Sequence, residues 1–238
     1  AATRHGRVQP VRLRINSGVH ASTHEYLATA HEDQKFGVTL ADAPRLVAAI
    51  RAEPSLAFLG LHSHIGSQIF DTEGFGEAAR RLLALHAQLL ADGDVPELNL
   101  GGGFGIAYTI DDSPATAQEL ARGLDDIIDH ECRAFGLDKP VLSVEPGRSI
   151  SGPAGTALYT VGTTKNVEIG GGQQRRYVSV DGGMSDNIRP ALYAAEYSAV
   201  LANRVSPAAP VLSRVVGLHC EGGDILVRDV FLPGDTGI

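Results

Sequence analysis

The fold is decided by the stretch ELNLGGGFG at residues 97–105, in which a short apolar run ends in three glycines. The stretch VLSVEPGR at residues 141–148 has the same design, with an apolar run that ends in a carboxylate. Glycine has no Cβ, so backbone N–H groups can converge on an anion, and short apolar runs of this kind are typical of buried strands. The two stretches predict a phosphate cradle and a carboxylate at two strand ends that face one site.

Strands and helices alternate on both sides of these stretches. We expect strands at 11–16, 56–64, 98–100 and 141–144, and helices at 42–52, 73–91 and 116–135. In the second helix, Leu82, Leu85 and Leu89 recur on one face at helical spacing. Alternation of this kind predicts parallel strands joined by crossover helices, which is an α/β fold.

The pattern changes after about residue 152. Short β-rich runs follow at 157–161, 176–180, 215–219 and 225–231. The glycines at 170–172 predict a hairpin turn between the first two runs. We therefore expect two parts, a cofactor-binding α/β part at 1–152 and a β-rich part at 153–238.

Composition narrows the class of protein. The chain has 238 residues and a net charge of −8, which argues against a nucleic-acid partner and gives no sign of attraction to a membrane surface. No apolar signal segment opens the sequence, and no run reaches transmembrane length. The two cysteines, Cys132 and Cys220, lie far apart and have no metal-type spacing, so a reducing cytoplasm is the expected location.

Two histidines, His62 and His64, end the expected strand at 56–64 and point to the same side of it. A metal site would need an aspartate or a further histidine from other strand ends, and we predict no metal. Two interpretations stay open. The histidines form a structural pair in a packed barrel, or one imidazole stacks on an aromatic cofactor ring while Ser67 offers its hydroxyl to a phosphate.

Glu145 and Arg148 lie three positions apart beyond a short strand. A carboxylate beside a pyridine nitrogen keeps that nitrogen protonated and makes the ring a strong electron sink. Arg148 can clamp a phosphate or a substrate carboxylate through two hydrogen bonds. A salt-bridged loop is the plainer alternative. Together with the glycines, this carboxylate predicts a pocket for pyridoxal 5'-phosphate.

The β-rich part carries two further polar loops. In the loop at 181–193, Arg189 and Tyr193 can both face an anionic amino-acid group, and surface salt bridging is the alternative. In the stretch HCEGGD at 219–224, the thiol of Cys220 lies beside acidic side chains. A lone cysteine is usually a small buried residue. In this setting it is a candidate proton donor.

Taken together, the motifs resemble those of diaminopimelate decarboxylases. This family belongs to the fold-type III pyridoxal phosphate group, with ornithine and arginine decarboxylases and alanine racemase. The matching motifs are HIGSQ at 64–68, GGG at 101–103, EPGR at 145–148, DGGMSD at 181–186 and CEGGD at 220–224. The resemblance runs from Val11 to Pro233. It implies the second half of an alanine racemase-like (β/α)8 barrel, followed by the start of a β-rich C-terminal domain.

The resemblance also implies a role for each matching position. For the cofactor it implies ring stacking by His64, a hydrogen bond from Glu145 to the pyridine nitrogen, and contacts from Ser67, Gly101, Gly102, Gly103, Gly147 and Arg148. For the substrate it implies contacts from Arg148, Arg189, Tyr193 and Glu221. The catalytic residues that the resemblance implies are His64, Glu145 and Cys220. Of these, Cys220 would supply the proton that replaces CO₂.

The implied activity is the decarboxylation of meso-2,6-diaminopimelate to L-lysine, in a cytoplasmic homodimer whose subunits share active sites. Two alternatives are another decarboxylase of the ornithine or arginine type and a non-catalytic relative that binds a ligand or partner. A racemase of this fold would use a tyrosine and a lysine as its acid and base. Cys220 followed by Glu221 therefore favours decarboxylation.

Three departures from the family pattern stand out. The family's Asn-Pro-Gly is NSG at 16–18, and its Cys-Glu-Ser-Gly-Asp is CEGGD at 220–224. None of the three lysines, Lys35, Lys139 and Lys165, has the context of the family's Schiff-base lysine. We therefore expect a fragment that lacks the first barrel half and the C-terminal end, and we expect this chain alone to be inactive.

Overall fold

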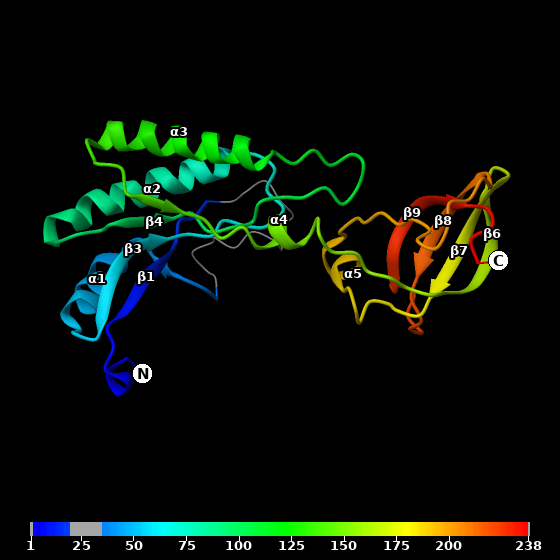
Figure 1. The fold of residues 1–238 in the computed structure, drawn as a ribbon, viewed down its shortest axis with the longest axis horizontal. Helices are drawn as coiled ribbons and strands as arrows, with labels where there is room; N and C mark the ends of the chain where they lie inside the picture. Colours follow the sequence, from blue (N-terminus) through cyan, green and yellow to red (C-terminus); the bar gives the residue numbers. More distant parts are fainter. Residues whose placement is uncertain (1, 20–34, 238) are drawn as a thin grey trace. The chain divides into compact units, whose positions relative to one another are not determined.

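The computed structural model describes residues 2–19 and 35–237. By its internal contacts the chain divides into two compact units (Figure 1). Unit 1 comprises residues 1–106 and 113–154, and unit 2 comprises residues 107–112 and 155–238. Among the described residues, no helix is both long enough and apolar enough to cross a membrane.

A five-stranded parallel sheet in the order β2-β1-β3-β4-β5 forms the centre of unit 1 (Figure 1). The strands are β1 (Gln9–Asn16), β2 (Val38–Thr39), β3 (Leu56–His62), β4 (Glu97–Asn99) and β5 (Val141–Ser143). The helices are α1 (Ala43–Ala52), α2 (Glu73–Leu89), α3 (Ala117–Phe135) and the short α4 (Gly147–Ser151), with 3-10 turns at Thr3–His5 and Leu90–Asp92. The predicted alternation of parallel strands and crossover helices is confirmed.

Helix α3 shows how the sequence sets these elements. It begins at a capping box, in which the hydroxyl of Thr116 accepts the Glu119 N–H and the Glu119 carboxylate accepts the Thr116 N–H. It ends at Gly136, whose φ of 65° lies in the left-handed region. Between these ends, Leu124 and Ile128 are buried one turn apart. The helix therefore covers the core with one face and meets water with the other.

The core of unit 1 lies between the sheet and its helices. Buried apolar side chains come from α1, α2 and α3 and from alternate strand positions. They include Ile15, Val47, Leu61, Leu82, Leu83, Leu98 and Ile128. Figure 1 shows α2 and α3 packed side by side. Because Leu61 and Leu98 face these helices, the residues after them in each strand face the opposite side of the sheet.

Unit 2 contains a four-stranded sheet in the order β6-β7-β8-β9. The strands are β6 (Val161–Gly170), β7 (Gln173–Val180), β8 (Pro210–Val216) and β9 (Ile225–Pro233), and one short helix, α5, spans Arg189–Tyr193. The β6–β7 and β8–β9 pairs are antiparallel, whereas β7 and β8 are parallel. The turn predicted at 170–172 joins β6 to β7, with φ values of 97°, 63° and 73° that favour glycine.

Some predicted boundaries are wrong. The run expected at 157–161 becomes a strand only from Val161, because the Thr160 N–H donates to the Asp181 carboxylate rather than to a sheet. The run expected at 215–219 is shifted, and its strand is β8. Helices α4 and α5 and strand β2 were not predicted. They are too short to show a periodic pattern.

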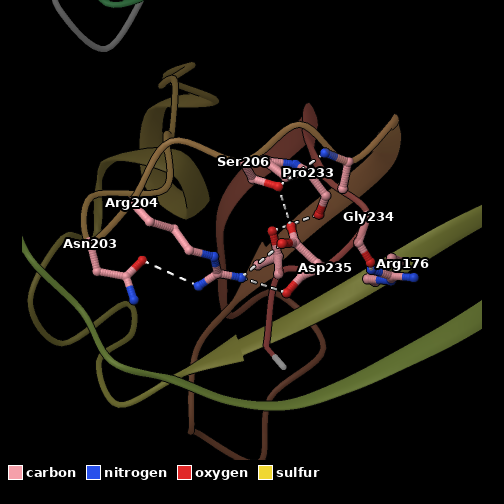
Figure 2. A network of polar contacts seen from close by, with 9 residues as sticks. Arg176, Asn203, Arg204, Ser206, Pro233, Gly234 and Asp235 are labelled. Atoms are coloured by element: carbon pink, nitrogen blue, oxygen red, sulfur yellow. Dashed lines mark hydrogen bonds and ion pairs between the residues drawn. The ribbon is translucent and has the colours of Figure 1, made fainter.

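A polar network ties the segment after β9 to the loop before β8 (Figure 2). The Arg204 guanidinium donates to the Asp235 backbone oxygen at 2.9 Å and lies 3.2 Å from its carboxylate. The Ser206 hydroxyl donates to the same carboxylate at 2.7 Å, and this bond, with Arg204, lowers the pKa of Asp235. Arg176 of β7 donates to the Gly234 carbonyl. These contacts fix where the chain leaves the sheet of unit 2.

Candidate active site

A row of polar residues crosses the sheet of unit 1 near the carboxyl ends of its strands. The strand register places Arg14 beside His62, His62 beside Asn99, and Asn99 beside Ser143. The preceding row in the same register contains Leu13, Leu61, Leu98 and Leu142, which pack into the core. Side chains alternate along each strand, so the polar row faces away from the helices.

The Glu145 carboxylate lies at the end of this row, two residues beyond β5. The Asn99 amide nitrogen donates to one carboxylate oxygen, Oε1, at 3.1 Å. The other oxygen, Oε2, lies 3.4 Å from Nε2 of His62. The Glu145 side chain is still 56% exposed, so the carboxylate can accept a further donor from outside the protein. Asn99 therefore holds the carboxylate from within the protein, and the exposed part of the carboxylate remains accessible to a ligand.

The three glycines follow β4 and make a tight turn beside this carboxylate. The Gly101 N–H donates to Oδ1 of Asn99 at 2.7 Å, and the Gly102 N–H donates to Nδ1 of His64 at 3.2 Å. The Gly103 N–H makes no hydrogen bond within residues 2–19 and 35–237. Of the three amides predicted to cradle a phosphate, two are thus held by side chains and that of Gly103 is available.

The glycines are also required by close packing. A Cβ at Gly102 would lie far inside van der Waals contact with the Glu145 carbonyl oxygen, whereas a Cβ at Gly147 would meet nothing within 4 Å. We expect Gly102→Ala to lower the free energy of unfolding by about 1–3 kcal/mol, because the backbone must move to admit the methyl group. Gly147→Ala is the matched control, and urea denaturation measures both. Equal stability of the two variants would contradict this account.

Gln68 joins the loop after β3 to the loop after β5. Its Oε1 accepts from the Arg148 guanidinium at 3.1 Å and from the Ile106 N–H at 3.2 Å, while its Nε2 donates to the Ile106 carbonyl at 2.6 Å. The Ser67 hydroxyl makes no hydrogen bond to any described residue. The three motifs at 64–68, 101–103 and 145–148 therefore form one connected site.

Burial lowers the pKa of both histidines in this site. The Glu145 carboxylate raises the pKa of His62 and so opposes the effect of burial, whereas the positive charges of Arg14 and Arg12 lower it further. For His64 the cationic Arg14 and then His62 add to the effect of burial, and Glu145 opposes it. Burial alone lowers the pKa of His86, a core residue of α2 whose Nδ1 has no hydrogen-bond partner among the described residues.

We expect the stability of unit 1 to fall as the pH drops below about 6.5, the ordinary histidine value. The folded-state pKa of each of these histidines is lowered, so in this range the unfolded chain binds more protons and acid favours unfolding. His86→Phe removes one such group and should lose less stability in acid. Urea midpoints at pH 7.5 and 5.5 test this. An identical acid loss in wild type and His86→Phe would contradict it.

In unit 2 the structure brings together the loops at 181–186 and 217–224. The buried Asp224 carboxylate accepts the Met184 N–H through one oxygen and the His219 N–H through the other, the latter at 2.8 Å. The Ser185 hydroxyl lies 2.7 Å from Nε2 of His219. These bonds hold the conformation of the turn that contains Cys220. Cys220 is a free and exposed cysteine.

The predicted substrate-binding residues of unit 2 lie in or near α5 and the Cys220 turn. The Arg189 guanidinium donates to the Tyr197 hydroxyl at 3.0 Å and lies over the Tyr193 ring, 5.6 Å from its centroid. The Glu221 carboxylate accepts the Gly223 N–H at 3.2 Å, which caps its own turn. Arg189 and Tyr193 thus lie side by side, and their role in binding an anionic group stays a prediction.

Sequence reasoning missed several side chains of the unit 1 site. Asn99 and Gln68 were quoted within motifs but given no role, and Arg14 was assigned only to an expected strand. His62 was considered as a metal ligand, as a structural residue or as one of two imidazoles that could stack on the cofactor, but not as a neighbour of Glu145. Within the described part of the chain, no three His, Cys, Asp or Glu side chains gather in a group that could hold a metal ion. The available signal was a polar residue following a core leucine in several strands.

The side chains of unit 1 fit pyridoxal 5'-phosphate. A pyridine nitrogen needs a carboxylate, and Glu145 presents one that is held on its inner side and exposed on its outer side. A phosphate needs donors, and the Ser67 hydroxyl, the Gly103 amide and the Arg148 guanidinium come from loops of the same site. The site thus offers a carboxylate for one end of the cofactor and hydrogen-bond donors for the other.

Comparison with known proteins agrees with this geometry. Residues 2–152 match the family model described as pyridoxal-dependent decarboxylase, pyridoxal binding domain. The chain is 50% identical over 238 residues to a diaminopimelate decarboxylase of Mycobacterium tuberculosis, covering 97% of this chain and 53% of that protein. The chain spans about half the length of the curated relatives it matches.

Solved structures give the same result. Diaminopimelate decarboxylase from M. jannaschii, in co-complex with L-lysine, is 30% identical with a TM-score of 0.80, covering 98% of this chain and 52% of that one. The Helicobacter pylori enzyme complexed with L-lysine is 28% identical with a TM-score of 0.75, covering 98% and 55%. The predicted resemblance and the predicted α/β barrel fold are confirmed. The family model covers more than half of the chain, and the chain belongs to the pyridoxal-dependent decarboxylase family.

Proposed function

We propose that the whole protein decarboxylates meso-2,6-diaminopimelate to L-lysine and uses pyridoxal 5'-phosphate as its cofactor. The observation that carries this proposal is the Glu145 carboxylate, fixed by Asn99 at the strand ends of unit 1 and open on its outer side. The high identity to diaminopimelate decarboxylases supports the choice of substrate.

The cofactor, when bound, supplies an electron sink for the pair left behind when CO₂ departs. Glu145 keeps a proton on the ring nitrogen, and His64 offers its imidazole face to the ring. Ser67, Gly103, Gly147 and Arg148 hold the phosphate. Gly101 and Gly102 contribute shape, since their amides are engaged by Asn99 and His64 and their lack of a Cβ admits neighbouring backbone. His64 and Glu145 are thus the catalytic groups of unit 1.

Unit 2 supplies the groups for the substrate in this proposal. Arg189 and Tyr193, together with Arg148, bind the distal carboxylate of diaminopimelate, and Glu221 binds its distal amino group. Cys220 donates the proton that replaces CO₂. The exposed thiol and its fixed turn support this role. We further propose that the protein is a cytoplasmic homodimer in which Cys220 serves the site of the partner subunit.

We propose that the two parts of the sequence have the two roles just described. Residues 1–152 form a partial (β/α)8 barrel that binds the cofactor, and residues 153–238 form a partial β domain. The lysine that tethers the cofactor lies outside the present numbering. In support of this, Nζ of Lys35 lies over the Phe36 ring, 5.3 Å from its centroid, Lys139 pairs with Asp125 and Asp129 on α3, and Lys165 belongs to β6 of unit 2.

Carboxyl-labelled substrates test the proposal. The holoenzyme containing this chain is incubated with meso-2,6-diaminopimelate, L-ornithine or L-arginine, and released CO₂ and amine products are counted. We expect CO₂ and L-lysine in equal amounts from diaminopimelate and little CO₂ from the other two. Faster release from ornithine or arginine would favour another decarboxylase of the fold. Binding of diaminopimelate without release of CO₂ would favour a non-catalytic relative.

A further inference from the structure

The polar row of unit 1 contains more polar groups than the proposed mechanism uses. Arg14, His62, Asn99 and Ser143 lie in register on the sheet face opposite the helices. Nε2 of His62 and Oγ of Ser143 are both buried and have no hydrogen-bond partner among the described residues. Buried polar atoms are costly unless they are satisfied, and each atom without a partner calls for an explanation.

The two oxygens of the Glu145 carboxylate have different neighbours in this row. Oε1 accepts from Asn99, whereas Oε2 faces Nε2 of His62 at 3.4 Å. Contacts to both oxygens define the plane of a carboxylate, and a contact to one oxygen alone leaves it free to rotate. We propose that Asn99 and His62 are positioning residues that fix the Glu145 carboxylate toward the pyridine nitrogen of the cofactor. This inference rests on the proposed function.

The chemistry of Asn99 supports this role. Its amide nitrogen donates to Glu145 at 3.1 Å, and its amide oxygen accepts from Gly101 at 2.7 Å. One planar group therefore links the carboxylate to the first glycine of the cradle. Aspartate has the same shape and could still accept from Gly101, but it could not donate to Glu145 and would place a second negative charge beside it.

The charges around His62 are consistent with a neutral imidazole at pH 7. Burial lowers its pKa, the Glu145 carboxylate opposes this effect, and Arg14 and Arg12 add to it. The neighbouring His64 also faces this group. A neutral imidazole carries one N–H. Nε2 lies 3.4 Å from Oε2 of Glu145 and makes no hydrogen bond in this structure, and in our proposal it donates one when the ring turns toward the carboxylate. His62 therefore supports the carboxylate without neutralising its charge.

A cofactor analogue separates positioning from simple structural support. Apoprotein prepared from the holoenzyme is titrated with pyridoxal phosphate and with the analogue in which C–H replaces the ring nitrogen. The dissociation constant of each is measured for wild type and for Asn99→Asp. We expect the substitution to weaken binding of pyridoxal phosphate by about tenfold, the usual effect of a hydrogen bond to a charged group, and to leave binding of the analogue unchanged.

His62→Phe keeps the ring and removes Nε2, and it should show the same selective loss. It also provides the test if Asn99→Asp does not fold. Equal weakening of both ligands by these variants would mean that the residues only support the fold, and it would overturn the inference. If wild type bound neither ligand, the proposed cofactor itself would be wrong, which is a different failure.

Discussion

Glu145→Gln in the holoenzyme is expected to lower kcat for decarboxylation by about a hundredfold to a thousandfold, the usual effect of removing one preorganised electrostatic contact. Glutamine has nearly the same shape and can still accept from Asn99. It carries no charge, however, and cannot keep a proton on the ring nitrogen of the cofactor. Substrate binding depends on other groups in our proposal, so KM should change much less than kcat.

The control for this prediction is Glu73→Gln. Glu73 is an exposed carboxylate at the start of α2, and it has no part in the proposed site. Its substitution removes the same charge and should leave kcat unchanged. A Glu145→Gln enzyme with wild-type kcat would mean that the carboxylate does not act on the ring. The role proposed for the unit 1 site would then be wrong.

Cys220→Ser is expected to lower kcat by about a hundredfold to ten-thousandfold, the range for a lost general acid. A serine hydroxyl gives up its proton far less readily than a thiol, while its size and its place in the turn are nearly the same. The turn itself should persist, because it is held by Asp224 and by the contact between Ser185 and His219. Steady-state rates of CO₂ release measure the effect.

The other cysteine of the chain is the control. Cys132 is buried in α3, and burial raises the pKa of its thiol, so it should stay protonated and unreactive. Cys132→Ala should keep kcat and lose only some stability. If Cys220→Ser kept full activity, the proton that replaces CO₂ would come from another donor, although the cofactor site of unit 1 could stand.

The sequence was sufficient to place the ends of strands β3, β4 and β5 to within two residues. The apolar runs before His62, Gly101 and Glu145 mark where each strand stops, and parallel strands bring such ends to the same edge of a sheet. For this reason three motifs far apart in the chain could be assigned to one site before the structure was known. The helix predicted at 116–135 likewise agrees with α3 to within a residue.

The contacts beneath the site could not be predicted, because they depend on strand register. Asn99 meets Glu145 only because residue 99 pairs with residue 143 across β4 and β5, and a shift of one residue would turn Asn99 into the core. The hydrogen bond from the Gly102 N–H to His64 likewise depends on the strand register and on the orientation of the imidazole ring. The predicted boundaries of β6 and β8 were wrong for a related reason, because the sequence does not show at which residue the pairing between strands begins.

A crystal structure of the cofactor-loaded holoenzyme tests the central claim most directly, because it shows which end of the cofactor meets which loop. We predict that a Glu145 oxygen lies within hydrogen-bond distance of the pyridine nitrogen, with the phosphate at Ser67 and the Gly103 amide. A ring nitrogen turned away from Glu145, or a phosphate bound away from the glycine turn, would contradict the account.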